Sequence, residues 1–186
     1  MDPISNKKDF EDLTTNLRDL AYSYIEKYSP SKQQVKTYLL KKYLKKFQGS
    51  KSKKDISAII DKIVLNLEKN RLIDDKLYSD SKARVFLRRG YSINKIGMAL
   101  RTKGIGTENI KLSIEKLKED KPDPDFNSAM KICKKKRIGP LRPEANREIY
   151  YKKDMGILAR SGFGYEISKK ILSMTQKEFN QLYKLI

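Results

Sequence analysis

Apolar residues in this chain of 186 residues fall into helix-like stripes that recur three times in the same order. One stripe has the spacing 0, +3, +4 and another the spacing 0, +4, +7, and each spacing places its side chains on one face of a helix. A pair of apolar residues five positions apart stands between them. The sets are Ala21/Tyr24/Ile25, Leu39/Leu44 and Ile56/Ile60/Ile63, then Ala83/Phe86/Leu87, Leu100/Ile105 and Ile110/Ile114/Leu117, then Ala129/Ile132/Cys133, Leu158/Phe163 and Ile167/Ile171/Met174. The order predicts three units of three helices.

Residues that favour helix ends stand between these stripes. Ser29-Pro30 places a capping hydroxyl before a first-turn proline, and Ser92 and Thr107 are further candidate caps. Thr175-Gln-Lys-Glu178 has the form of a capping box and predicts a final helix to about Leu185. Glycines suited to the C-terminal ends of helices are Gly90, Gly104 and Gly162.

The sequence predicts an all-α protein made of tandem three-helix repeats. Sustained alternation of apolar and polar residues, which would indicate strands, does not occur. Lys121-Pro-Asp-Pro-Asp125 is the best linker, because two prolines prevent a continuous helix. The expected segments are a frayed N-terminus at 1–8, helical repeats at 9–73, 74–120 and 121–174, and a C-terminal helix at 175–186.

Basic residues are far more numerous than acidic ones and occur in blocks. The chain has 42 Lys plus Arg against 23 Asp plus Glu, a formal charge of +19. Residues 31–54 hold nine bases and no acid, residues 82–103 seven bases and no acid, and residues 131–153 nine bases and two acids. Such a charge indicates a polyanionic partner.

The basic blocks supply the candidate binding residues. In stacked repeats they would align into one cationic stripe, whereas each block taken alone is also compatible with a merely solvated face. Arg84 and Arg88 lie one turn apart on one helix face. The candidates are Arg84, Arg88, Arg89, Lys95, Arg101, Lys103, Lys134, Lys135, Lys136, Arg137, Arg147, Lys152, Lys153 and Arg160.

The sequence offers no enzyme active site. It contains no histidine, which excludes Ser-His, Cys-His and His-metal arrangements, and it has no phosphate-binding glycine loop. Asp74-Asp75 and Asp120/Asp123/Asp125 could hold Mg²⁺, but a helix N-terminus and a decorated loop are the simpler interpretations. We therefore expect no cofactor, no metal and no catalysis, with an enzyme that acts on nucleic acid through Asp74, Asp75 and a metal as a minor alternative.

Three other features bear on function. The single cysteine, Cys133, falls at the position of Ile25 and Leu87 in the other copies, which favours a buried small hydrophobe over a reactive thiol. No apolar run approaches the ~18 residues of a membrane span, so an intracellular protein without a membrane partner is expected. The tyrosines could stack on bases or form the amphipathic edge of the core; they are Tyr22, Tyr24, Tyr28 and Tyr38.

Four segments of the chain resemble the RecX family of bacterial recombination regulators. Three follow one another between residues 70 and 105: Asn70-Arg-Leu-Ile-Asp-Asp-Lys-Leu-Tyr78, Arg84-Val-Phe-Leu-Arg-Arg-Gly90 and Ile96-Gly-Met-Ala-Leu-Arg-Thr-Lys-Gly-Ile105. The fourth is Ile157-Leu-Ala-Arg-Ser-Gly-Phe-Gly-Tyr-Glu-Ile167. The likeness extends over about residues 21–174 and is most specific between 70 and 117.

The resemblance implies both a fold and a function. The fold is an elongated, curved array of three tandem three-helix repeats. The function is binding of the RecA recombinase and its filament on single-stranded DNA, most often to inhibit filament growth, ATP hydrolysis, strand exchange and co-protease activity. A cytoplasmic monomer that also touches DNA fits this role. The alternative is a general basic helical protein that binds nucleic acid without a recombinase partner.

Overall fold

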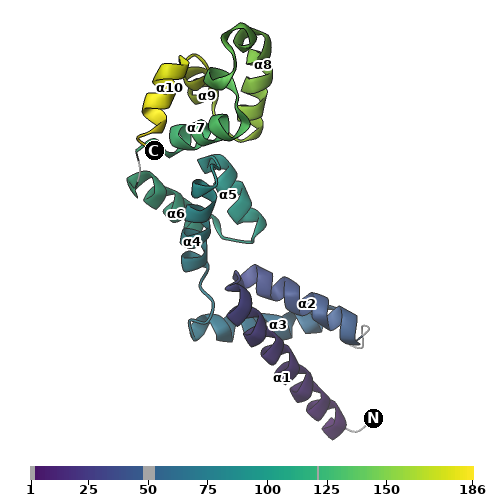
Figure 1. The fold of residues 1–186 in the computed structure, drawn as a ribbon. Helices are drawn as coiled ribbons and strands as arrows, with labels where there is room; N and C mark the ends of the chain where they lie inside the picture. Colours follow the sequence, from purple (N-terminus) through teal and green to yellow (C-terminus); the bar gives the residue numbers. More distant parts are fainter. Residues whose placement is uncertain (1–2, 48–52, 121) are drawn as a thin grey trace. The chain divides into compact units, whose positions relative to one another are not determined.

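The protein is all-helical throughout the residues that its structure, a computed structural model, describes: 3–47, 53–120 and 122–186 (Figure 1). These residues form ten α-helices and one short 3₁₀ helix and contain no strand, which confirms the all-α prediction. The helices are α1 (Pro3–Tyr28), α2 (Lys32–Phe47), α3 (Lys53–Lys69), α4 (Asp75–Arg88), α5 (Ile93–Thr102), α6 (Thr107–Asp120), α7 (Pro124–Lys136), η1 (Gly139–Leu141), α8 (Glu144–Arg160), α9 (Tyr165–Leu172) and α10 (Gln176–Tyr183).

The chain divides into two compact units. Unit 1 comprises residues 1–78 together with Lys103–Ile105, and unit 2 comprises 79–102 and 106–186. The helix order α1–α3, α4–α6 and α7–α9, followed by α10, is consistent with three three-helix repeats. The exact repeat boundaries remain a prediction.

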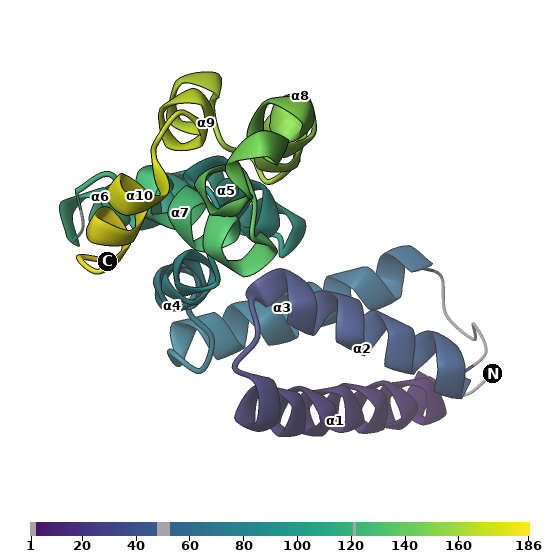
Figure 2. The same cartoon turned by 45° about the horizontal axis from the view of Figure 1, so that its top comes forward.

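Unit 1 has a core between three helices. Figure 2 shows α1, α2 and α3 lying side by side, and each contacts the other two. The apolar stripes predicted from the sequence point into this core: Ala21, Leu39 and Ile56 are completely buried. Tyr24 and Tyr38 stack on each other at the edge of this core, with ring centroids 4.1 Å apart, as the core-edge interpretation expects.

Unit 2 has its main apolar cluster among the C-terminal helices. α7, α8, α9 and η1 pack together, and α10 lies against α7 (Figure 1). Completely buried members of this cluster include Ala129, Cys133, Leu158, Ile171 and Phe179. Earlier in the unit, α5 packs on α6, and buried Leu100 and Ile110 belong to this pair. The predicted stripes therefore supply the core of both units.

Glycines end the helices as predicted. Gly90, Gly104 and Gly162 all have left-handed backbones, with φ of 81°, 77° and 89°. Gly104 and Gly162 also adjoin another segment so closely that a Cβ would collide with the side chain of Gln33 or of Ser92, respectively. These two glycines are therefore required by both backbone conformation and packing.

Two predicted N-terminal caps lie at neighbouring residues instead. Ser29 ends α1 with φ of 42°, and the cap of α2 is Ser31, whose Oγ accepts a hydrogen bond from the N–H of Gln34 over 3.3 Å. Pro30 lies between the two serines and restricts the backbone there, and Ser31, the serine that follows it, caps α2. Thr107 is the first residue of α6, and Gly106 precedes it as the cap. The caps expected at Ser92 and Thr175 are confirmed, the latter with a complete capping box.

α1 begins at Pro3 and α10 ends at Tyr183. The expected segments at 1–8 and 175–186 remain predictions, whereas the expected burial of Leu44 needs correction. Leu44 is 50% exposed, and Tyr43 is buried in its place. In the second and third copies a glycine turn separates the paired apolar residues, whereas α2 continues to Phe47. Five residues along an unbroken helix amount to about 140° of rotation, which turns Leu44 away from the core.

Candidate functional site

The candidate basic residues lie on four helices, and all except Lys103 belong to unit 2. α4 carries Arg84 and Arg88, with Arg89 just beyond its end, and α5 carries Lys95 and Arg101. The remaining candidates lie on or next to α7 and α8: Lys134, Lys135, Lys136, Arg137, Arg147, Lys152, Lys153 and Arg160. Their alignment into one stripe remains a prediction.

The structure brings two of these residues together around a hollow, which we call the basic groove. Arg84 and Arg88 on α4 line it with α6 and α7, and its volume is about 220 Å³. A third cation, Lys131 on α7, lies at the same groove. Sequence reasoning did not single out Lys131, although it opens the basic block 131–153. The groove thus gathers three positive charges from two helices.

The base of the basic groove is apolar. Leu87 on α4 and Leu117 on α6 line it with 9% and 2% exposure, and buried Pro124 opens α7 beside them. Among the described residues that line the groove, Asp120 is the one carboxylate, and its Oδ2 lies 3.3 Å from a terminal guanidinium nitrogen of Arg84. Both side chains are more than half exposed, so this ion pair contributes at most about 1 kcal/mol. Arg84 can therefore exchange this partner for another carboxylate at little cost.

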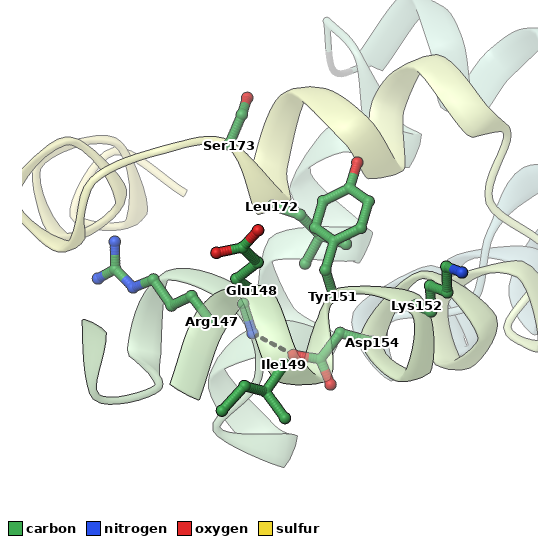
Figure 3. Close-up of a pocket in the computed structure, with 9 residues that line it drawn as sticks. Arg147, Glu148, Ile149, Tyr151, Lys152, Asp154, Leu172 and Ser173 are labelled. Atoms are coloured by element: carbon green, nitrogen blue, oxygen red, sulfur yellow. Dashed lines mark hydrogen bonds between the residues drawn. The ribbon is translucent and has the colours of Figure 1, made fainter. Parts of the chain in front are cut away.

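Two other candidates, Arg147 and Lys152, line a second hollow of about 630 Å³ on α8. Figure 3 shows their side chains pointing to opposite sides of it. Arg147 donates hydrogen bonds to the carbonyl oxygens of Pro140, over 2.6 Å, and Arg142, over 3.4 Å. These bonds hold the segment that contains η1 against α8. Arg147 thus uses two of its five donors within its own chain, and the binding role expected for it remains a prediction.

A buried ion pair, which sequence reasoning missed, lies beneath the same hollow. Asp154 is 1% exposed and accepts two hydrogen bonds from the guanidinium of Arg142, over 2.7 and 2.8 Å. It accepts a third from the N–H of Gly139 over 2.9 Å, drawn as the dashed line in Figure 3. The hydrogen bonds to Asp154 raise the pKa of Arg142. Asp154 stands four residues before Leu158, where Val35 and Ile96 stand before Leu39 and Leu100. This register identifies it as a core position.

Several candidate lysines lie over tyrosine rings. The Nζ of Lys95 is 4.6 Å from the ring centre of Tyr91, and that of Lys134 is 5.7 Å from the ring of Tyr183. Lys153 lies 5.5 Å from the ring of Tyr150. Such contacts restrict the side chain but keep its charge available to a partner. The candidates that are simply exposed on helices or helix ends are Arg89, Arg101, Lys103, Lys135, Lys136, Arg137, Lys152 and Arg160.

The acidic pair Asp74-Asp75 accepts hydrogen bonds from backbone N–H groups at two helix N-termini. Asp74 Oδ1 accepts hydrogen bonds from the N–H groups of Lys76 and Leu77, at the start of α4. Asp75 accepts one from the N–H of Lys32, over 2.9 Å, at the start of α2. These bonds agree with the helix-terminus interpretation of Asp74-Asp75. In the part of the chain that the structure describes, no group of three or more acidic or sulfur side chains is arranged to hold a metal.

Cys133 is completely buried, and this burial, with a smaller contribution from the charge of Asp154, raises its pKa to about 12. A thiol with such a pKa is protonated at neutral pH and does not act as a nucleophile. This agrees with the interpretation of Cys133 as a buried small hydrophobe. Among the described residues, no helix is both long enough and apolar enough to span a membrane.

Comparison with known proteins gives the family. No family model matches the chain. The regulatory protein RecX of Myxococcus xanthus (strain DK1622) is 30% identical over 161 residues, which cover 85% of this chain and 84% of that protein. The chain belongs to the RecX family of regulatory proteins. The regulatory protein RecX of Agrobacterium fabrum (strain C58 / ATCC 33970) is 27% identical over 108 residues, 58% of this chain and 55% of that one.

A solved structure shows the same fold. The crystal structure of a regulatory protein RecX aligns with a TM-score of 0.66 and 22% sequence identity. The alignment covers 94% of this chain and 80% of the other. At this identity the likeness shows the fold alone. The RecX fold is therefore present along almost the whole chain, and the family resemblance read from the sequence is confirmed.

Proposed function

We propose that this protein is a cytoplasmic, monomeric regulator that binds the RecA recombinase and its filament on single-stranded DNA. Bound in this way, it inhibits the recombinase's ATPase, strand-exchange and co-protease activities. The observation that carries the proposal is membership of a family whose curated relatives are named regulatory proteins. The exposed basic residues of unit 2 support it, because they provide a surface for an acidic protein face or for DNA phosphate.

The proposed mechanism is binding without catalysis. Exposed cations on α4, α5, α7 and α8 each contribute little, but several weak contacts to one filament act together. The charge sets the rate of encounter and the register of the complex. A protein held across neighbouring recombinase protomers would block the addition and movement of subunits, which accounts for inhibition without any reaction carried out by this chain.

The direct test is binding to the cognate RecA in the absence of DNA. Immobilised protein should retain RecA in a pull-down at physiological salt. A gel shift with labelled single-stranded DNA and no RecA measures the competing activity. Retention of RecA supports the proposal, whereas a gel shift without any retention of RecA would contradict it.

A paired charge reversal tests the basic surface. Arg88→Glu together with Arg89→Glu should keep the helical circular-dichroism signal and weaken RecA binding by at least about tenfold. The matched control is Lys169→Glu with Lys170→Glu, two adjacent exposed lysines on α9 that lie outside the three basic blocks. Equal weakening in both double variants would show a response to net charge alone and would remove the α4 residues from the mechanism.

The second candidate function is general binding of nucleic acid, favoured by the formal charge of +19. It predicts an affinity for DNA or RNA that falls steeply with salt. The logarithm of the binding constant plotted against the logarithm of the salt concentration should have a slope of about −0.7 to −0.9 per phosphate contacted. It also predicts no dependence on a recombinase. The pull-down without DNA therefore separates the two functions.

A further inference from the structure

We propose that the basic groove binds an acidic peptide segment of a protein partner and accepts one large apolar side chain of that segment. The groove lies between α4, α6 and α7, entirely within unit 2. The inference deepens the proposed function and rests on it, since it names the kind of partner segment that these arginines recognise. It can also be tested without a recombinase, by measuring the affinity of this chain for a peptide.

The size of the groove favours a single side chain. Pockets that hold a whole small molecule are roughly 300–1,000 Å³, and the basic groove has about 220 Å³. Its base is formed by Leu87 and Leu117, which are almost completely buried. An apolar side chain placed there would contact the two leucines and remove its own surface from water. The geometry therefore suits a residue such as leucine projecting from a peptide.

The charge of the groove selects acidic neighbours for that residue. Of the lining residues that the structure describes, Arg84, Arg88 and Lys131 are positively charged and Asp120 alone is negatively charged. Arginine can bind a carboxylate through two parallel hydrogen bonds, which gives direction as well as attraction. Carboxylates on both sides of the inserted residue would meet these cations at the edge of the groove.

The same lining argues against nucleic acid at this site. Single-stranded nucleic acid is held by stacking of its bases on aromatic side chains beside a basic track. The residues lining the basic groove are Arg84, Leu87, Arg88, Leu117, Asp120, Pro124, Asn127, Ser128 and Lys131, none of which is aromatic. A phosphate backbone needs cations but gains nothing from an apolar base. The combination of apolar base and cationic edge fits an acidic peptide.

Asp120 acts as an internal competitor in this arrangement. Its carboxylate lies 3.3 Å from the guanidinium of Arg84, where a partner carboxylate would bind. Because the pair is exposed, it is exchanged easily. Asp120→Asn removes the competing charge and should tighten binding of an acidic peptide by about twofold to fivefold. A purely structural role for Asp120 predicts no gain in affinity.

The test uses a short fluorescein-labelled peptide in which one leucine is flanked by two glutamates on each side. Fluorescence anisotropy at low salt measures its affinity for the full-length chain. The same peptide with serine in place of leucine, and a labelled oligothymidine, serve as comparison probes. Arg88→Glu and Lys131→Glu should each weaken the leucine peptide by about tenfold. Lys111→Glu, an exposed residue of α6 outside the lining, is the matched control and should leave the affinity unchanged.

The leucine peptide should bind about tenfold more tightly than the serine peptide, because only leucine buries apolar surface in the groove. Equal affinity for the two peptides would overturn the inference, as would equal weakening by Lys111→Glu and Lys131→Glu. Binding of the oligothymidine that is lost in Arg88→Glu, with no binding of the peptide, would assign the groove to nucleic acid instead. Circular dichroism confirms that each variant is folded.

The inference and the proposed function fail separately. If the peptide does not bind but the chain still retains RecA, only the groove assignment is wrong. If the peptide binds as described but RecA is not retained, the groove stands as a peptide site and the recombinase proposal is wrong.

Discussion

The carboxylate of Asp125, in the first turn of α7, accepts a hydrogen bond of 2.6 Å from the backbone N–H of Ile93, the first residue of α5. Close by, Ser92 Oγ donates to the carbonyl oxygen of Ser161 over 3.1 Å. The start of α5 is thus hydrogen-bonded to two later segments of unit 2, an arrangement that we call a joint. Unit 1 contains the same kind of joint. There the N–H of Lys32 donates to Asp75 and Ser31 Oγ donates to the carbonyl of Lys103, over 2.9 and 2.7 Å.

Asp125→Ala should destabilise unit 2. It leaves the N–H of Ile93 at the start of α5 without its acceptor, which typically costs about 0.5–2 kcal/mol. Urea unfolding followed by circular dichroism measures the change. Glu119→Ala, which removes one exposed carboxylate from α6, is the control and should shift the midpoint little. Equal effects of the two substitutions would show that the hydrogen bond between Ile93 and Asp125 does not stabilise unit 2.

Leu100→Ala tests the register of the repeats in the core. Leu100 is completely buried in α5, so its truncation should lower the free energy of unfolding by about 2–5 kcal/mol. Met98→Ala in the same helix is the matched control, because Met98 is 66% exposed and should change stability by less than about 1 kcal/mol. A small effect of Leu100→Ala would show that the stripe does not form the core.

The buried ion pair of Asp154 and Arg142 gives a double-mutant test. Asp154→Ala leaves the guanidinium of Arg142, which is 20% exposed, without its partner and should cost about 3–5 kcal/mol. Asp154→Leu combined with Arg142→Met replaces the pair by apolar side chains, as at Ile96, and should recover most of that loss. If the double variant is as unstable as Asp154→Ala, the pair is needed for more than mutual neutralisation.

Asp80 makes stability depend on pH. Burial alone would raise its pKa, but hydrogen bonds from Lys116 and Ser113, together with the charges of Lys116 and Arg84, outweigh it and lower the pKa below the ordinary value of 3.8. A lowered pKa contributes stability above pH 3.8, which is lost as the pH falls through the folded-state value. The stability difference between the wild type and Asp80→Asn should therefore be largest near neutral pH and shrink in acid. A difference independent of pH would contradict this account.

The sequence predicted the helices and most of the core because both depend on local spacing. Ala21, Ala83 and Ala129 are completely buried and the other members of their stripes are buried or partly buried, and the glycine turns at Gly104 and Gly162 lie where expected. The error at Leu44 has a physical cause. A pair five residues apart faces the core only if the helix breaks between its members, and spacing alone does not report the break.

The candidate site was less accessible from the sequence because its parts meet through tertiary packing. Arg84 and Arg88 share a helix face and were recognised together. Lys131 joins them only because α7 packs beside α4. The charge of Arg147 is visible in the sequence, but its hydrogen bonds to two carbonyl oxygens depend on a turn whose course the sequence does not reveal. The burial of Asp154 can be read only from its register with Val35 and Ile96, because a single acid in a helix otherwise suggests an exposed position.

ATP hydrolysis by the cognate RecA on single-stranded DNA, measured while the concentration of this protein is raised, tests the central claim most directly. We expect the steady-state rate to fall, with a longer lag before it is reached, and Arg88→Glu with Arg89→Glu to require a much higher concentration for the same effect. A rate and a lag that stay constant up to a large excess of this protein over RecA would contradict the account.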